Sequence, residues 1–124
     1  MIKKDQKLNY RYDDLADALF IYVIDGPDYE EAIELDSNIF LVVGDDNYPT
    51  ALEILDASKV LDVQKFSLKR INRIHLKMCI SNDKIIVECI LNLLIHSGEE
   101  IKSTNSTIVN DMGLPTLEAE LAMV

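Results

Sequence analysis

Three acidic residues, Asp17, Glu53 and Asp56, are the strongest candidates for chemistry in this chain. Asp17 and Glu53 each precede an apolar run in an expected strand, where a carboxylate must find a partner or face solvent. Hard cations prefer carboxylate oxygens as ligands, so this pair is the first choice for a ligand or cation site. Asp56 precedes an expected helix, and the local alternative for it is to cap free amides of the first turn.

The cysteines and histidines predict neither a metal centre nor a disulfide. The hairpin register described below places Cys79 and Cys89 on opposite faces of a sheet. His75 and Cys79 share a face, but four strand residues span about 13 Å, which is too far for two ligands of one metal ion. We therefore expect reduced cysteines and no bound metal.

Motifs for nucleophilic or cofactor chemistry are absent from the sequence. The four glycines stand at positions 26, 44, 98 and 113, so the chain has no Gly-x-Ser-x-Gly, Gly-x-Gly-x-x-Gly or Gly-x-x-x-x-Gly-Lys segment. We expect no cofactor and assign no catalytic residue. The sequence favours a non-enzymatic role over an enzyme of unknown reaction.

Charge is distributed unevenly along the chain. Residues 1–62 contain fifteen Asp and Glu against five Lys and Arg, a net charge of −10, whereas residues 63–124 contain seven of each kind. An acidic face repels phosphates and disfavours nucleic acid, but it suits a basic protein partner or a cation; solubility alone is the other explanation. The sequence has neither a membrane-spanning apolar segment nor the apolar stretch of a signal peptide, so we expect a cytoplasmic protein.

The first half of the chain has the pattern of strands joined by turns. Residues 8–12 and 18–24 are two expected strands. Residues 32–43 alternate apolar and polar side chains, which predicts one half-buried strand. A turn over residues 44–49 then leads into a further strand over residues 50–55.

Residues 58–73 are expected to be helical. Either Asp56 or Ser58 can cap the start of this segment by accepting a hydrogen bond from a free amide. Ser67 is expected to open a short second helix that continues through Ile74.

The clearest pattern in the second half is a hairpin. Residues 74–80 and 85–95 both alternate, and the tight-turn sequence Ser-Asn-Asp-Lys lies between them. If the turn is centred on its Asn-Asp pair, Met78 faces Val87. The other expected pairs are Ile74 with Leu91, Leu76 with Cys89, Lys77 with Glu88, and Ile80 with Ile85. One face of this hairpin is wholly apolar.

The opposite face of the hairpin carries three aliphatic side chains, Ile86, Ile90 and Leu94. Such a stripe on an expected solvent face indicates a second contact surface. We expect a two-fold homodimer through it. The alternative is that residues 116–124, which fit either a strand or a helix, fold back over the stripe. A further strand is expected over residues 100–109.

Two sequence blocks resemble a known family. The first, Tyr-Asp-Asp-Leu-Ala-Asp-Ala-Leu-Phe-Ile at positions 12–21, is similar to the Tyr-Asp-x-x-x-Asp-Ala-Leu-Tyr-Ile start of domain-of-unknown-function family 2283. The second, Leu-Glu-Ile-Leu-Asp-Ala-Ser at positions 52–58, resembles the family's Gly-Ile-Glu-Ile-Leu-Asp-Ala-Ser end. Ala51 stands where the family usually has glycine. The resemblance covers residues 10–58, and residues 63–124 form a C-terminal extension outside it.

The resemblance implies an antitoxin-like role, because members of this family are often encoded beside small basic proteins that resemble RNase-type toxins. The acidic first half of the chain suits such a partner. We therefore expect a non-enzymatic protein-interaction module. The alternative is a small ligand- or cation-binding domain that uses Asp17 and Glu53.

Together these elements predict a single α+β domain over residues 1–124. We expect an antiparallel sheet or partly closed barrel of six to eight strands, with one helical segment near residues 58–73. The domain has a family-like acidic half, residues 10–58, and a β-hairpin-rich half, residues 63–124.

Overall fold

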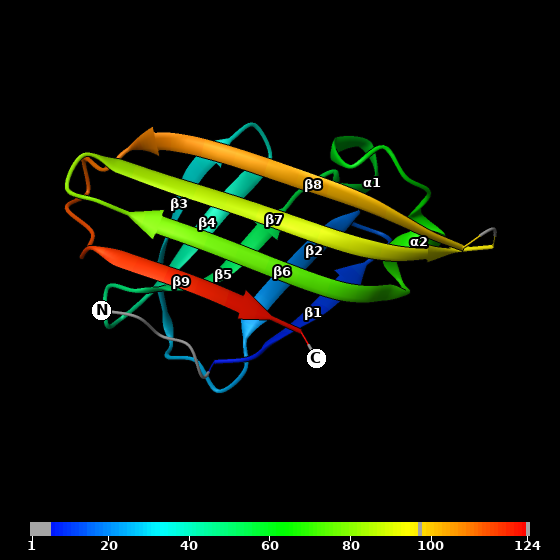
Figure 1. Cartoon of the computed structure of the whole chain (residues 1–124), viewed down its shortest axis with the longest axis horizontal. Helices are drawn as coiled ribbons and strands as arrows, with labels where there is room; N and C mark the ends of the chain where they lie inside the picture. The colour runs from blue at the N-terminus through cyan, green and yellow to red at the C-terminus, as the bar shows by residue number, and fades with distance from the viewer. Residues whose placement is uncertain (1–5, 97, 124) are drawn as a thin grey trace.

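The computed structural model describes residues 6–96 and 98–123 of the chain, without the side chain of Glu30. In this part of the chain nine strands form two antiparallel sheets, and two single-turn helices connect the fifth strand to the sixth (Figure 1). The strands are β1 (Leu8–Asp13), β2 (Ala18–Val23), β3 (Tyr29–Asp36), β4 (Ile39–Gly44), β5 (Pro49–Ile54), β6 (Ile71–Ile80), β7 (Lys84–Ile95), β8 (Gly98–Val109) and β9 (Leu117–Ala122). The helices are α1 (Ala57–Val60) and α2 (Lys65–Leu68).

The first sheet contains β1 to β5 in the order β1-β2-β5-β4-β3. The strands predicted over residues 8–12, 18–24 and 50–55 are confirmed as β1, β2 and β5. Strand β5 lies in the middle and pairs with both β2 and β4, so Glu53 has Phe20 on one side and Phe40 on the other. Side chains of opposed residues share a face of the sheet; these three therefore point the same way, away from the core.

The second sheet contains the remaining strands in the order β8-β7-β6-β9. The predicted hairpin is confirmed in register, because Met78 is opposite Val87 and Lys77 is opposite Glu88. The other three predicted pairs are present as well. The strand expected over residues 100–109 is β8, and it pairs with β7 along its whole length.

The two sheets pack face to face, with their strands crossing in projection (Figure 1), and one hydrophobic cluster fills the space between them. Each fully buried aliphatic side chain stabilises the fold by roughly 1.5–3 kcal/mol relative to its exposed state. The largest fully buried side chains come from both sheets and the connection between them: Leu8, Leu19, Ile21, Leu41, Leu52, Ile54, Leu68, Ile74, Leu76, Ile85, Leu91 and Leu93.

The prediction of one strand over residues 32–43 is wrong, because the chain turns back in the middle of this segment. Strands β3 and β4 form a hairpin with Ser37 and Asn38 at its turn. Asn38 has a positive φ of 69°, a conformation that asparagine tolerates better than most residues. The carboxylate of Asp36 accepts a hydrogen bond from the Ser37 amide at 2.8 Å and supports the turn.

The helical region is shorter than predicted. Helices α1 and α2 have four residues each, and β6 already begins at Ile71, so the expected helix through Ile74 is wrong. Ser67 lies inside α2 rather than at its start. In the part of the chain that the structure describes, no helix is long and apolar enough to cross a membrane.

The C-terminal segment is a strand. Strand β9 pairs with β6, with Ala119 opposite Met78 and Leu121 opposite Leu76, so its apolar residues complete the core face. Buried Asn110 holds the β8–β9 connection in place, because its side-chain amide donates to the carbonyls of Ser81 and Leu114 at 2.9 and 3.0 Å.

The predicted fold class is confirmed in part, because the sheets are antiparallel and a short helical segment lies where it was expected. The chain is predominantly β, its nine described strands exceed the six to eight expected, and they form two open sheets rather than a partly closed barrel. Along one side of the sandwich the two sheets are linked, because Lys7 forms a parallel bridge with Ala122 and accepts a hydrogen bond from the Ile24 amide at 2.8 Å. On the other side lie the edge strands β3 and β8.

Candidate functional site

Asp17 lies in the turn between β1 and β2 and is buried, with 6% of its surface exposed. Its Oδ1 accepts hydrogen bonds from the Tyr12 hydroxyl at 2.7 Å and from the Ser58 amide at 3.0 Å. Its Oδ2 accepts a hydrogen bond from the Ser58 hydroxyl at 2.7 Å. The carboxylate thus joins the first sequence block to the last residue of the second.

These contacts set the protonation of both partners. Burial raises the pKa of Asp17, but the hydrogen bonds from Ser58 and Tyr12 outweigh it, so the net pKa of this carboxyl is lowered. Burial and the adjacent Asp17 carboxylate raise the pKa of Tyr12, which keeps its hydroxyl a donor. Asp17 is therefore ionised and held by three donated hydrogen bonds.

Lys65 and Lys69 pack the helical connection against the same turn. Lys69 Nζ lies 2.6 Å from a carboxylate oxygen of Asp14, and Lys65 Nζ donates to the Asp14 carbonyl at 3.1 Å. The hydrogen bond and charge of Lys69 lower the pKa of Asp14. These contacts connect α2, which lies beyond the family-like segment, to the first sequence block.

Glu53 lies elsewhere, on the outer face of the five-stranded sheet. It is half-buried and lines a broad, shallow groove of about 1050 Å³. The groove is lined by Arg11, Tyr12, Asp13, Asp14, Ala18, Phe20, Tyr29, Glu31, Ala32, Val42 and Glu53. Asp17 does not line it, so the structure does not bring the two predicted acids to one open site.

The lining of the groove combines aromatic and acidic side chains. The Phe20 ring meets that of Tyr29 edge to face at 5.6 Å and stacks on that of Tyr22 at 5.8 Å. The Arg11 guanidinium lies 5.2 Å from the centroid of the Phe20 ring and 5.4 Å from that of Tyr22. Four acids against one arginine give the lining a formal charge of −3.

Sequence reasoning missed these aromatic residues. Phe20 and Tyr22 are two residues apart on β2, so the period of a strand places them on one face. Arg11 is opposite Phe20 in β1, and this pairing appears only once the register between the strands is known.

Asp56 precedes α1 in the left-handed conformation, with a φ of 49°. It is exposed, and among the described residues its side chain caps no amide of the helix. The expectation that Asp56 caps the helix is therefore wrong. Its carbonyl accepts the amides of Lys59 and Val60 instead, and the side chain of Ser58, the alternative cap, is directed to Asp17.

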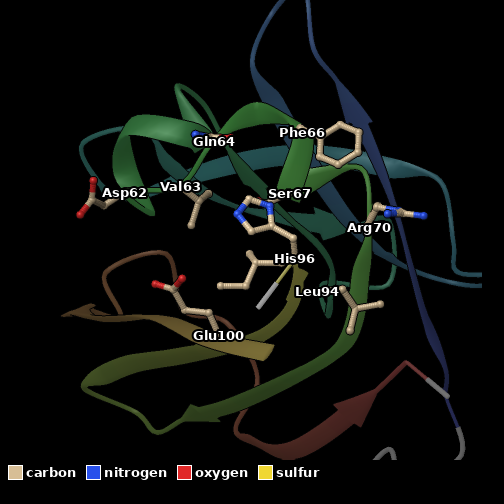
Figure 2. Close-up of a pocket in the computed structure, with 10 residues that line it drawn as sticks. Asp62, Val63, Gln64, Phe66, Ser67, Arg70, Leu94, His96 and Glu100 are labelled. Atoms are coloured by element: carbon tan, nitrogen blue, oxygen red, sulfur yellow. The ribbon is translucent and has the colours of Figure 1, made fainter. Parts of the chain in front are cut away.

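A second hollow of about 380 Å³ lies between the helical connection and the ends of β7 and β8. Figure 2 shows the His96 imidazole pointing into it, with Asp62 and Glu100 toward one side and Phe66 and Arg70 toward the other. Its lining mixes acidic, basic and apolar side chains: Asp62, Val63, Gln64, Phe66, Ser67, Arg70, Leu94, Ile95, His96 and Glu100. Neither Asp17 nor Glu53 reaches it.

The stripe of Ile86, Ile90 and Leu94 lies on the outer face of β7 in the four-stranded sheet. Ile86 is 36% exposed and Leu94 is 43% exposed, whereas Ile90 is half-buried. Strand β9 does not fold back over the stripe, because it pairs at the far edge of β6.

Both cysteines are free, as predicted, with Cys79 facing outward and Cys89 buried in the core. Burial raises the pKa of the Cys89 thiol to about 12. Within residues 6–96 and 98–123, no three His, Cys, Asp or Glu side chains are grouped so that they could hold a metal ion.

Comparison with known proteins finds one similarity, to a family model. No curated protein and no solved structure matches it significantly. A family described as "Protein of unknown function (DUF2283)" matches residues 9–58, from β1 through the start of α1. This range includes Asp17, Glu53 and Ser58, and it excludes the whole four-stranded sheet. The chain is thus similar to the DUF2283 family over residues 9–58, and the remainder of the chain lies beyond the family match.

Proposed function

We propose that this chain is a cytoplasmic, non-enzymatic interaction module that binds a small basic protein through the groove on its five-stranded sheet. The observation that carries this proposal is the composition of that groove, whose lining combines the aromatic rings of Tyr12, Phe20 and Tyr29 with four carboxylates. A basic side chain with a long aliphatic stem can pack on the aromatic rings while its charged end meets a carboxylate.

The charge of the chain supports the same partner. The net charge of −10 lies within residues 1–62, and these residues include every strand of the groove. An acidic surface of this kind attracts a basic protein and speeds its encounter. The resemblance to family 2283 adds an antitoxin-like role, in which the bound basic protein is an RNase-type toxin.

Two charge reversals on different sheets test the groove. Glu53→Lys changes the groove, and Glu118→Lys makes the same change on the exposed outer face of β9. The tagged chain and both variants are used to capture proteins from native lysate, and captured proteins are identified by mass spectrometry. The affinity of the most enriched basic protein is then measured by calorimetry at two salt concentrations.

We expect this basic protein to bind the wild type and the Glu118→Lys variant with the same affinity. The Glu53→Lys variant should bind about tenfold more weakly, since the loss of one well-placed charge contact costs roughly 1.4 kcal/mol. Glu53→Gln should show a smaller loss and serves as the milder variant if Glu53→Lys fails to fold. Equal affinities for all four proteins would show that the groove is not the docking surface.

The alternative function is a small ligand- or cation-binding domain. Glu53 lines an open groove, and this favours a ligand site at Glu53 over one at Asp17, whose carboxylate is engaged by Tyr12 and Ser58. Calorimetry with Ca²⁺ and Mg²⁺ on the wild type and the Glu53→Gln variant tests this. Binding of a cation that Glu53→Gln abolishes would favour the alternative.

We further propose that the second half of the chain self-associates as a two-fold homodimer. The exposed stripe of Ile86, Ile90 and Leu94 supports this, as does the balanced charge of residues 63–124. If two copies stack through this stripe, Ile90→Glu should give a folded monomer in sedimentation. A variant that remains dimeric would place the interface elsewhere.

A further inference from the structure

Strand β8 differs from the other three edge strands of the sandwich. Edge strands expose unpaired backbone groups and are commonly protected by shortness, charge or bulges. Strands β1 and β9 have six residues each and lie on the side where the bridge between Lys7 and Ala122 links the sheets. Strand β3 is acidic, and its pairing with β4 is irregular at two places. Strand β8 has twelve residues, pairs with β7 without a register shift and contains no proline.

The open edge of β8 carries the backbone groups of its odd-numbered residues. Asn110, the residue after β8, donates its amide to the Asp83 carbonyl on the β7 side at 3.0 Å. Backbone groups alternate in direction along a strand, so odd-numbered residues of β8 direct their N–H and C=O groups away from β7. Within the described part of the chain, β8 pairs only with β7, and no backbone hydrogen bond from a turn or loop reaches these groups. The open row comprises Glu99, Ile101, Ser103, Asn105, Thr107 and Val109.

The side chains of the same residues are exposed. Ile101 and Val109 have 67% and 68% of their surface exposed, and they stand near opposite ends of the strand. Residues 103–109 carry no charge. Lys102 and Glu100 point to the other face and pair with each other at 2.9 Å. The edge therefore offers a long, uncharged pairing surface with an aliphatic residue toward each end.

We propose that two copies of this chain pair antiparallel through β8, with Asn105 on the two-fold axis, and so join their four-stranded sheets into one continuous sheet. In this register Ile101 of each copy is opposite Val109 of the other, and Ser103 is opposite Thr107. The exposed aliphatic residues thus cover each other, and the open N–H and C=O groups gain partners. Between residues 101 and 109 the register brings no two like charges into opposition.

A second copy is favoured over another occupant because the edge is complementary to itself. The residue pairs above are symmetric, as an isologous two-fold contact requires. The contact also lies in the half of the chain whose charges balance. This inference rests on the self-association proposed above, but it does not depend on the acidic groove.

Proline at position 105 tests the edge without removing a bond within the sheet. Asn105→Pro deletes an outward N–H, and proline is tolerated in an edge strand when its nitrogen faces solvent. Asn105→Ala is the matched control, because it changes the side chain and keeps the donor. Sedimentation over a wide concentration range should show dimers for the wild type and Asn105→Ala, and monomers for Asn105→Pro. Circular dichroism checks that Asn105→Pro is folded.

A cysteine pair tests the register and remains informative if the proline variant fails to fold. In a Cys79→Ser background, Asn105→Cys should form a covalent dimer on mild oxidation, since paired strand residues lie about 5.5 Å apart, within disulfide range. Ser103→Cys should not, because its symmetry mate would be four residues away, roughly 13 Å along the strand.

Three results would overturn this inference. These are a wild type that is monomeric at every concentration, an Asn105→Pro variant that remains a folded dimer, and a Ser103→Cys variant that cross-links as readily as Asn105→Cys. A dimer that Ile90→Glu disrupts and folded Asn105→Pro does not would identify stacking of the Ile86, Ile90 and Leu94 stripes in its place. Loss of dimers with retained binding of the basic partner would leave the proposed groove intact.

Discussion

Ser58 donates both its amide and its hydroxyl to the two carboxylate oxygens of Asp17, at 3.0 and 2.7 Å, across 41 residues of sequence. Asp17 also receives the Tyr12 hydroxyl at 2.7 Å. Because Asp17 is buried, its ionised side chain needs these donors in place of water. Asp17 in the first sequence block and Ser58 in the second therefore have a structural role, which is to contact each other.

Removing this contact should destabilise the fold. Asp17→Asn keeps the size of the side chain but presents an N–H group to donors, so we expect the free energy of unfolding to fall by about 2–3 kcal/mol. Ser58→Ala retains the amide bond and should cost about 1 kcal/mol. Urea unfolding measures both changes. An Asp17→Asn variant as stable as the wild type would contradict this role.

The same carboxyl should make stability depend on pH. The pKa of Asp17 is lowered in the folded state, so the unfolded state binds its proton first as the pH falls, and folding is favoured by deprotonation. The stability difference between wild type and Asp17→Asn should be constant above about pH 5. It should shrink as the pH falls below the unfolded value of about 3.9 and through the folded value. A difference that grows on acidification would reverse the sign and refute the argument.

The two cysteines should differ sharply in reactivity. Burial raises the pKa of Cys89 to about 12, and only the thiolate is nucleophilic. Cys79 is half-buried on the outer face of β6 and should react first with iodoacetamide under native conditions. Mass spectrometry should find one modified site in the folded protein and two in urea. Equal modification rates under native conditions would show that the core opens readily.

Shortening a side chain on the inner face of the four-stranded sheet should lower the free energy of unfolding more than shortening one on the outer face. Leu76 is 2% exposed, so Leu76→Ala leaves a cavity and should cost about 2–5 kcal/mol of unfolding free energy. Ile86 is 36% exposed, and Ile86→Ala is the control that should cost less than about 1.5 kcal/mol. The comparison is made by urea unfolding at low protein concentration. Similar losses at both positions would mean that the outer face is also covered.

The alternation of apolar and polar residues predicted the β6–β7 hairpin correctly because the pattern depends only on residues close together in the sequence. The turn residues and the two apolar series lie within a short segment, and only one register brings both series to one face. The same kind of pattern gave a wrong prediction for β3 and β4. A two-residue turn at Ser37 and Asn38 keeps the inward and outward alternation of Ile33, Leu35 and Ile39 unbroken, so the two strands have the pattern of one.

A bulge at the start of β6 explains why the sequence predicted a helix that continued through Ile74. The pairing of β6 with β7 shifts between Ile71 and Arg73, so Ile71 and Ile74 both face the core although they are three residues apart. That spacing is also the spacing of a helical face. The polar residues between them, Asn72 and Arg73, are exposed in either case.

The faces of the β6 and β7 strands, their register and the uneven charge could be predicted from the amino-acid order, because each depends on the side chains along one segment. The surroundings of Asp17 and Glu53 could not be predicted in this way. The pairing of β2, β5 and β4 placed Glu53 between aromatic residues on an outer face, and the path of the chain after β5 brought Ser58 to Asp17. Both outcomes depend on contacts between residues distant in sequence, which local periodicity does not encode.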